Sequence, residues 1–217
     1  MPEAVAGSVV LPALSDAQET AAQQIRSEFA SHDTVLLQGV TSSGKTEIYM
    51  HFMAETLARG GDVLYLVPEI SVTAQLVERL RRAFGDRVTP CHSRLTPAGR
   101  TQAYMRVLNS AGGNLVVGAR SAVFMPFGRL GLVVVDEEHD GGYKQSEPAP
   151  RYNGRDAAVM LAALHGAKSL LGSATPSIES YANALAGKYA RVLLDERYGG
   201  ALPPQIIISD TLRAVKR

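Results

Sequence analysis

The chain has little cysteine, no tryptophan, no long apolar run and almost no net charge. Its 217 residues include one cysteine, Cys91, which cannot form a disulfide framework or a four-cysteine zinc site within the chain. No apolar run approaches the roughly 18 residues that a membrane-spanning helix needs. Residues 2–7 lack the charged and then apolar pattern of an export signal. These absences predict a protein that has no membrane partner and resides in the cytoplasm.

The net charge of +1 and the isoelectric point near 7.9 exclude an overall basic surface. Contacts with nucleic acid would therefore have to come from local patches. Three groups of arginines could form such patches: Arg79, Arg81 and Arg82; Arg94, Arg100 and Arg106; and Arg151 and Arg155. Groups of this kind are more often solvated helix faces, so composition alone leaves both interpretations open.

Strand-like and helix-like segments alternate along the chain. Strands are expected over residues 34–38, 62–67, 87–91, 114–118, 130–135, 168–171, 190–194 and 204–208. Helices are expected over residues 15–30, 44–59, 71–84, 97–109, 154–165 and 177–186. The polar stretch 140–153, with its glycines and prolines, is expected to be a long loop. This alternation predicts an α/β fold with a mainly parallel sheet and helices on both faces.

The run from Gly39 to Thr46 satisfies the phosphate-loop pattern G-x-x-x-x-G-K-[ST], with a strand before it and a helix after it. Glycines let the backbone curl around phosphate groups, and the helix N-terminus adds partial positive charge. Lys45 is expected to contact the β- and γ-phosphates, and the Thr46 hydroxyl to bind Mg²⁺. The sequence therefore predicts a nucleoside triphosphate site whose loop consists of Gly39, Thr41, Ser42, Ser43, Gly44, Lys45 and Thr46.

A second motif follows the apolar strand 130–135, where Asp136 and Glu137 stand at its carboxyl end. Ligand sites of parallel α/β sheets lie at that edge. Asp136 is placed to hold Mg²⁺ through water, and Glu137 to orient and deprotonate an attacking water. A bare acidic helix start is the alternative interpretation.

Asp-Glu-x-His, which ends at His139, resembles the signature of superfamily 2 helicases. Two further features agree with this resemblance. Residues 173–175 form the Ser-Ala-Thr motif, in which Ser173 and Thr175 would couple nucleotide and DNA sites. Gln18 resembles the glutamine that reads adenine, and His139 is implied to lie at the nucleotide. A solvated helix glutamine and an ordinary helix cap remain the plain alternatives.

Within that superfamily the chain resembles the replication-restart DNA helicases of the primosome. The matching segments are Gly39–Tyr49, Val67–Gln75, Gly118–Phe127, Asp136–Asp156 and Gly172–Ser177. The resemblance implies an ATP- and Mg²⁺-dependent 3′→5′ helicase that acts on single-stranded and forked DNA with primosome and restart proteins as partners.

The resemblance also implies how the chain is organised. Residues 15–200 look like the first of two RecA-like lobes, after a lead-in over 1–14. Residues 201–217 would begin the connection toward a zinc region and a second lobe, so zinc is expected only downstream. An isolated first lobe should bind nucleotide but hydrolyse little, because the arginine that stabilises the leaving phosphate comes from the second lobe.

The same resemblance implies a set of DNA contacts. Arg120 would meet a backbone phosphate, since one guanidinium can pair with two phosphate oxygens. The loop 140–153 looks like the aromatic-rich loop that links DNA contact to ATP hydrolysis, and its tyrosines could stack on unpaired bases. The expected DNA-binding residues are Arg120, Ser121, Tyr143, Lys144, Arg151 and Tyr152. A structural salt bridge for Arg120 and plain surface positions for the tyrosines are the alternatives.

Two other functional classes use part of the same chemistry. A phosphate-loop kinase needs an acceptor pocket with a lid, and a GTPase needs an Asn-Lys-x-Asp guanine reader; neither stands out here. A non-catalytic module that binds nucleotide and DNA, or another superfamily 2 DNA translocase, remains open.

Overall fold

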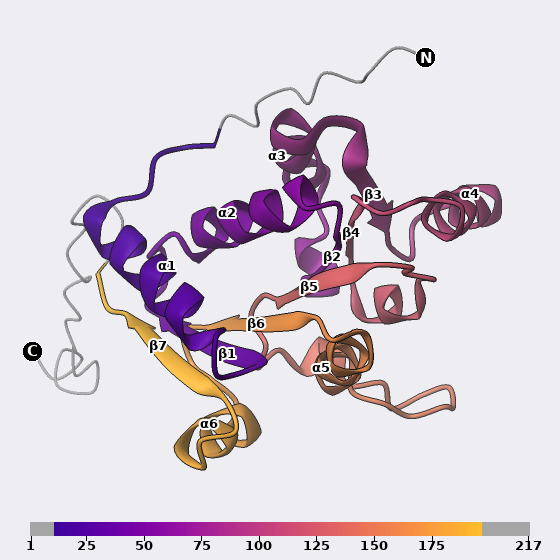
Figure 1. Ribbon diagram of the computed structural model, residues 1–217. Helices are drawn as coiled ribbons and strands as arrows, with labels where there is room; N and C mark the ends of the chain where they lie inside the picture. Colours follow the sequence, from indigo (N-terminus) through magenta and orange to yellow (C-terminus); the bar gives the residue numbers. More distant parts are fainter. Residues whose placement is uncertain (1–10, 197–217) are drawn as a thin grey trace, which may run out of the picture.

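The strands form one parallel sheet in the order β3-β4-β2-β5-β6-β1-β7 (Figure 1). The computed structural model describes residues 11–196. The strands are β1 (Thr34–Gly39), β2 (Asp62–Leu66), β3 (Val88–Cys91), β4 (Leu115–Gly118), β5 (Leu130–Val135), β6 (Lys168–Ser173) and β7 (Ala190–Leu194). All neighbouring pairs are parallel, as the alternation of segments predicts. The expected strand over 204–208 and the connection over 201–217 lie outside the described residues.

Helices cover both faces of the sheet (Figure 1). They are α1 (Asp16–Glu28), α2 (Lys45–Ala58), α3 (Ala74–Phe84), α4 (Pro97–Leu108), α5 (Gly154–His165) and α6 (Ile178–Leu185). Helices α1, α2 and α3 pack on one face, whereas α4 and α5, with α6 beside them, pack on the other. Val35 and Leu37 of β1 point to the first face and Leu36 to the second, so the continuously apolar strands are buried on both sides.

Side-chain caps set most helix starts. Ser15 and Gln18 form a capping box at α1, and the Thr96 hydroxyl accepts from the Gly99 amide at α4. The helix expected over 71–84 begins later, at Ala74, because the Thr73 hydroxyl accepts the Leu76 amide there. A 3₁₀ turn over residues 69–71 precedes it. Local hydrogen bonding thus decides the boundaries that periodicity alone misplaces.

The described residues contain four short 3₁₀ helices that were not expected from the sequence, and two of them lie near the expected site. Arg120–Phe124 follows β4, and Gly141–Tyr143 lies within the loop after β5. Both stand at the carboxyl edge of the sheet, next to the expected site. Among the described residues, no helix has the length and apolar character needed to cross a lipid bilayer.

The close approach of β3 and β4 requires glycine at position 118. A Cβ atom there would overlap the Cys91 carbonyl oxygen and lie 2.8 Å from the Ala122 Cβ. Gly118→Ala is therefore expected to destabilise the fold by about 1–3 kcal/mol, the usual cost of overpacking. Gly128→Ala is the matched control, because a Cβ at Gly128 meets no atom within 4 Å. Thermal denaturation of both variants checks this, and equal melting temperatures would contradict it.

Candidate nucleotide-binding and catalytic site

The order of the strands brings three motifs to one edge of the sheet. β6 lies between β1 and β5, so the phosphate loop after β1, the acids after β5 and the Ser-Ala-Thr motif at the end of β6 are neighbours. In register, Gln38 of β1 lies beside Ser173 of β6. Ligand sites in parallel sheets occupy this carboxyl edge. The sequence places each motif after a strand, but it does not show that these three strands are neighbours in the sheet.

The phosphate loop has the backbone form of an anion cradle. Ser42 and Gly44 both have positive φ, at 63° and 80°, and α2 starts directly afterwards. A Cβ at Gly44 would overlap the Gln18 amide, so this position needs glycine for space as well as for conformation. The buried Ser43 hydroxyl has no hydrogen-bond partner within the described residues. An unpaired buried hydroxyl in such a loop is what a bound phosphate oxygen would satisfy.

Lys45 extends along the inside of this loop. Its Nζ donates to the Gly39 carbonyl oxygen at 3.0 Å and lies 3.9 Å from Glu137 Oε1. The lysine is 7% exposed, so its charge is largely withdrawn from water. A buried ammonium between a carbonyl and a carboxylate is poised to exchange the carbonyl for a phosphate oxygen. This geometry agrees with the role predicted for Lys45.

Gln18 lies against the loop and not in solvent, since it is 1% exposed. Its Nε2 donates to the carbonyl oxygens of Ser43 and Gly44 at 3.1 and 3.3 Å, and its Oε1 accepts from the Ser15 amide at 2.9 Å. The plain alternative of a solvated glutamine is therefore wrong. The reading of adenine by Gln18 stays a prediction, because both ends of its amide are bonded to the protein here.

Asp136 and Glu137 stand directly beyond β5. Burial raises the pKa of the Asp136 carboxyl above its usual 3.8, and the neighbouring Glu137 charge raises it further, while Lys45 acts in the opposite direction. Glu137 has φ of 45°, a left-handed conformation that costs a non-glycine residue energy. Its side chain is 40% exposed and turns toward Lys45 and His139. Strain of this kind is common where a catalytic group must point in one direction.

Two tyrosines that the sequence analysis did not single out bind the Asp136 carboxylate. The Tyr49 hydroxyl donates to Oδ1 at 3.2 Å, and the Tyr65 hydroxyl donates to Oδ2 at 3.3 Å. Burial, and then the Asp136 charge, raise the pKa of both tyrosines well above 10, so both hydroxyls keep their protons and act as donors. They were missed because their positions follow the apolar patterns of α2 and β2.

The end of β6 contacts the acids through a short hydrogen-bond path. His139 Nδ1 lies 2.7 Å from the Ser173 hydroxyl, which also accepts from the Thr175 amide at 3.0 Å. His139 Nδ1 is 3.6 Å from Glu137 Oε2. Ser173 is buried and Thr175 is exposed at the surface. The structure therefore brings together the motif pair that the sequence places more than thirty residues apart.

Glu138 has a structural role that differs from that of its two neighbours. Its side chain is fully buried, and its oxygens accept from Arg155 Nη1 at 3.0 Å, from the Ser177 amide and hydroxyl at 2.7 and 2.9 Å, and from the Ser180 hydroxyl at 2.7 Å. These bonds fasten the start of α6 and the arginine of α5 to the acidic motif. Water cannot reach Glu138, so Glu137 is the better candidate for a base.

The residues at this edge fit a nucleoside triphosphate with Mg²⁺. The unpaired Ser43 hydroxyl and the buried Lys45 suit phosphate, and the oxygens of Thr46 and Asp136 suit a hard cation. Within residues 11–196, no group of three or more His, Cys, Asp or Glu side chains is arranged to hold a metal ion. Mg²⁺ commonly takes one or two protein ligands and completes its shell with phosphate and water.

The expected DNA-binding residues lie around the loop 140–153, and they do not form one exposed patch. Arg120 Nη1 donates to the carbonyl oxygens of Gly142 and Lys144 at 3.2 and 3.1 Å, so Arg120 holds this loop. The guanidinium also lies 5.9 Å from the Tyr152 ring centre. Phe124, which is 62% exposed, packs edge-on against Tyr152, with 5.2 Å between the two ring centres. Phe124 is an aromatic candidate that the motif comparison missed.

Tyr143 differs from the expectation. It is 1% exposed, and its hydroxyl donates to the Asp136 backbone oxygen at 2.7 Å. This burial does not agree with stacking of Tyr143 on an unpaired base; the ring faces the acidic motif because its 3₁₀ turn points it inward. Ser121, Lys144 and Arg151 are exposed, and Tyr152 is half-buried.

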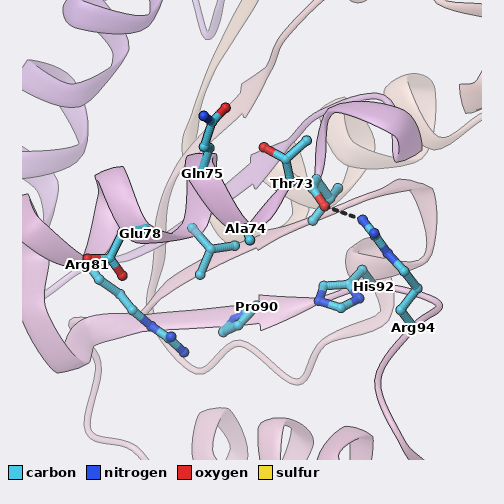
Figure 2. Close-up of a pocket in the computed structure, with 10 residues that line it drawn as sticks. Thr73, Ala74, Gln75, Glu78, Arg81, Pro90, His92 and Arg94 are labelled. Carbon is cyan, nitrogen blue, oxygen red and sulfur yellow. Dashed lines mark hydrogen bonds between the residues drawn. The ribbon is translucent and has the colours of Figure 1, made fainter.

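An open pocket of about 710 Å³ lies between the start of α3 and the end of β3 (Figure 2). Glu78 and Arg81 come from α3, and His92 and Arg94 come from the segment after β3 (Figure 2). Arg94 donates to the Val72 carbonyl oxygen at 2.7 Å. Partial burial and the Arg94 charge lower the pKa of His92. Arg81 and Arg94, from two of the predicted arginine groups, thus line one hollow.

The family model described as DEAD/DEAH box helicase matches residues 15–184. The replication restart protein PriA of Bacillus subtilis is 43% identical over 199 residues, which are 91% of this chain and 24% of that protein. PriA of Rickettsia felis is 41% identical over 206 residues, covering 95% of this chain and 31% of that protein. The chain spans less than a third of the length of these relatives.

Solved structures of other proteins share this fold. RecG bound to a three-way DNA junction matches with a TM-score of 0.61 and 22% identity, over 90% of this chain and 25% of that chain. The DUF1998 helicase MrfA bound to DNA matches with a TM-score of 0.59 and 20% identity, over 85% and 26%. The predicted RecA-like parallel sheet and the predicted helicase resemblance are both confirmed.

Asp136→Asn is expected to stabilise the fold while nucleotide is absent. Because the folded-state pKa of Asp136 is raised, its ionised carboxylate costs stability above that pKa, and the cost disappears as the pH falls through it. At pH 7 the melting temperature should rise, by about 2–4 °C for each kcal/mol of relief in a domain of this size.

Thermal denaturation at several pH values checks this expectation, and the gain should shrink toward acidic pH. Asp33→Asn is the control, because a hydrogen bond from Lys168 lowers the pKa of Asp33 and no gain should result. A melting temperature of Asp136→Asn at or below that of the parent at pH 7 would contradict the expectation.

Proposed function

The chain belongs to the DEAD/DEAH box helicase family, and from this premise we propose that it is the ATP-binding motor lobe of a 3′→5′ DNA helicase that acts in replication restart. The observation that carries the proposal is the meeting of Lys45 with the Asp136–Glu137 pair at the edge of the sheet. The proposed location is the cytoplasm, and the proposed partners are single-stranded and forked DNA with primosome and restart proteins. Zinc would bind only in the rest of a longer protein.

In this proposal each residue of the edge has one task. Lys45 and the loop amides bind the phosphates, and Thr46 and Asp136 hold Mg²⁺, which would neutralise phosphate charge. Glu137 accepts the proton of the attacking water, for which its partial exposure and its turn toward Lys45 are suited. His139, Ser173 and Thr175 connect these groups to the end of β6.

The proposed DNA path crosses the loops after β3, β4 and β5. Arg120 now holds two neutral carbonyl oxygens, and a phosphate could compete for its guanidinium because charge-assisted hydrogen bonds are roughly twice as strong. The pocket of Figure 2 adds two further arginines to this proposal, Arg81 of α3 and Arg94 after β3. Tyr152 with Phe124 offers the aromatic surface that the loop was expected to provide.

A non-catalytic module that binds nucleotide and DNA is the second candidate. It is favoured for the chain by itself, because among the described residues no arginine forms a hydrogen bond or ion pair with residues 39–46 or with Glu137. An arginine supplied from a second lobe would complete the site and is typically worth about 10³–10⁵ in rate. We therefore propose that the isolated chain binds ATP but hydrolyses little of it.

Lys45→Ala is expected to weaken nucleotide binding by about 1.5–3 kcal/mol, or roughly 10- to 150-fold, because a charge-assisted contact to phosphate is lost. Titration with a fluorescent ADP measures it on the chain itself. Lys188→Ala, at an exposed lysine after α6, is the matched control and should bind like the parent. Equal affinity of Lys45→Ala and the parent would exclude the phosphate-loop assignment.

Glu137→Gln, made in the complete helicase, is expected to keep ATP bound and to lower DNA-stimulated hydrolysis about 10²–10⁴-fold, since an amide cannot take the proton. Phosphate release and nucleotide binding are measured side by side. Glu179→Gln, the same change at an exposed position of α6, should leave both unchanged. Normal turnover by Glu137→Gln would assign the base to another residue.

A further inference from the structure

We infer that Tyr49 and Tyr65 are positioning residues that hold the Asp136 carboxylate for Mg²⁺. The inference rests on the proposed function, in which Asp136 binds the metal through water. Each hydroxyl donates to a different oxygen of the carboxylate, at 3.2 and 3.3 Å. A third donor, the Glu137 amide, contacts Oδ1 at 3.1 Å. Three fixed donors leave the carboxylate one orientation.

Tyr49 reaches Asp136 from α2, which packs over β2 and β5. The tyrosine lies on α2, one turn after Thr46, whereas Asp136 follows β5, and β6 runs between β1 and β5. The path is open only because β6 has glycine at position 172, where a Cβ would overlap the Tyr49 hydroxyl. Gly172 comes directly before Ser173 of the Ser-Ala-Thr motif. One hydroxyl therefore connects the phosphate-loop helix, the acidic motif and the end of β6.

Tyr65 approaches from β2, the strand on the other side of β5. Its hydroxyl donates to Asp136 Oδ2 at 3.3 Å. Both rings are fully buried and pack edge-on at 6.2 Å, so the hydroxyls have little freedom to move.

Groups that orient a metal ligand typically change metal affinity 10- to 100-fold when they are removed. The effect expected here is specific, because the phosphate loop and Lys45 do not depend on either hydroxyl. Tyr49→Phe and Tyr65→Phe should leave nucleotide affinity in EDTA unchanged. Each should raise the Mg²⁺ concentration that gives half-maximal enhancement of nucleotide binding by about 10-fold.

The experiment titrates Mg²⁺ against the chain in the presence of a fluorescent, non-hydrolysable ATP analogue. Tyr189→Phe is the matched control, since Tyr189 packs on the opposite face of the sheet from Tyr49 and Tyr65. Each Tyr→Phe change is repeated in an Asp136→Asn background. If the hydroxyls act through the carboxylate, their effect disappears there, as a double-mutant cycle measures. Circular dichroism melts confirm that the variants are folded.

An unchanged Mg²⁺ dependence in both folded variants would overturn the inference. An effect that persists undiminished in the Asp136→Asn background would also overturn it, because the hydroxyls would then act by another route. The parent chain distinguishes these results from a failure of the proposed function. If the parent binds no nucleotide at any Mg²⁺ concentration, the proposed function falls, and the inference falls with it.

Discussion

The position of β6 between β1 and β5 is the constraint on which the whole site depends. Two strand spacings, about 10 Å, separate the phosphate loop from the acids. Across that gap the long Lys45 side chain brings its Nζ to 3.9 Å from Glu137 Oε1. The gap also forces the protein to bridge β6 wherever the two motifs touch directly. The Tyr49 hydroxyl does so over Gly172, and His139 does so by contacting Ser173 at the end of β6 itself.

Buried charge on the opposite side of the acidic motif keeps this arrangement fixed. The Glu138–Arg155 pair is almost fully withdrawn from water, and such pairs add little net stability compared with apolar packing. Such a pair nevertheless fixes the positions of its two side chains, because separating them leaves a buried charge without a partner. Glu138 satisfies its oxygens with Ser177 and Ser180 as well, so the start of α6 cannot shift without breaking several bonds. The Glu138–Arg155 pair therefore holds in one conformation the strained segment in which Glu137 has positive φ.

The sequence predicts well where the helices and strands lie along the chain, but it does not predict which strands are neighbours in the sheet. Strand and helix periods are local, so nearly every described element was found, and the phosphate loop and acids carry patterns that chemistry requires. The strand order is a long-range property that no local pattern contains. Tyr49 and Tyr65 were missed for that reason, since their rings look like core residues until Asp136 is placed beside them. Tyr143 was misjudged because a polar loop indicates exposure, whereas a 3₁₀ turn buries this one ring.

The buried Tyr143 ring connects the proposed DNA path to the proposed nucleotide site at the carboxyl edge of the sheet. Arg120 binds the carbonyl oxygens on either side of Tyr143, at Gly142 and Lys144, and the Tyr143 hydroxyl binds the backbone of Asp136. In the proposed helicase, a phosphate that draws Arg120 away would release both carbonyls at once. The segment that carries Tyr143 would then lose its outer support while its inner contact remains. In this proposal a movement of that segment would reach Asp136 through the 2.7 Å hydrogen bond of Tyr143 and through the short stretch of chain between the two residues. A DNA contact and a metal ligand can thus be coupled over few residues, which is what a motor lobe built on a rigid parallel sheet requires.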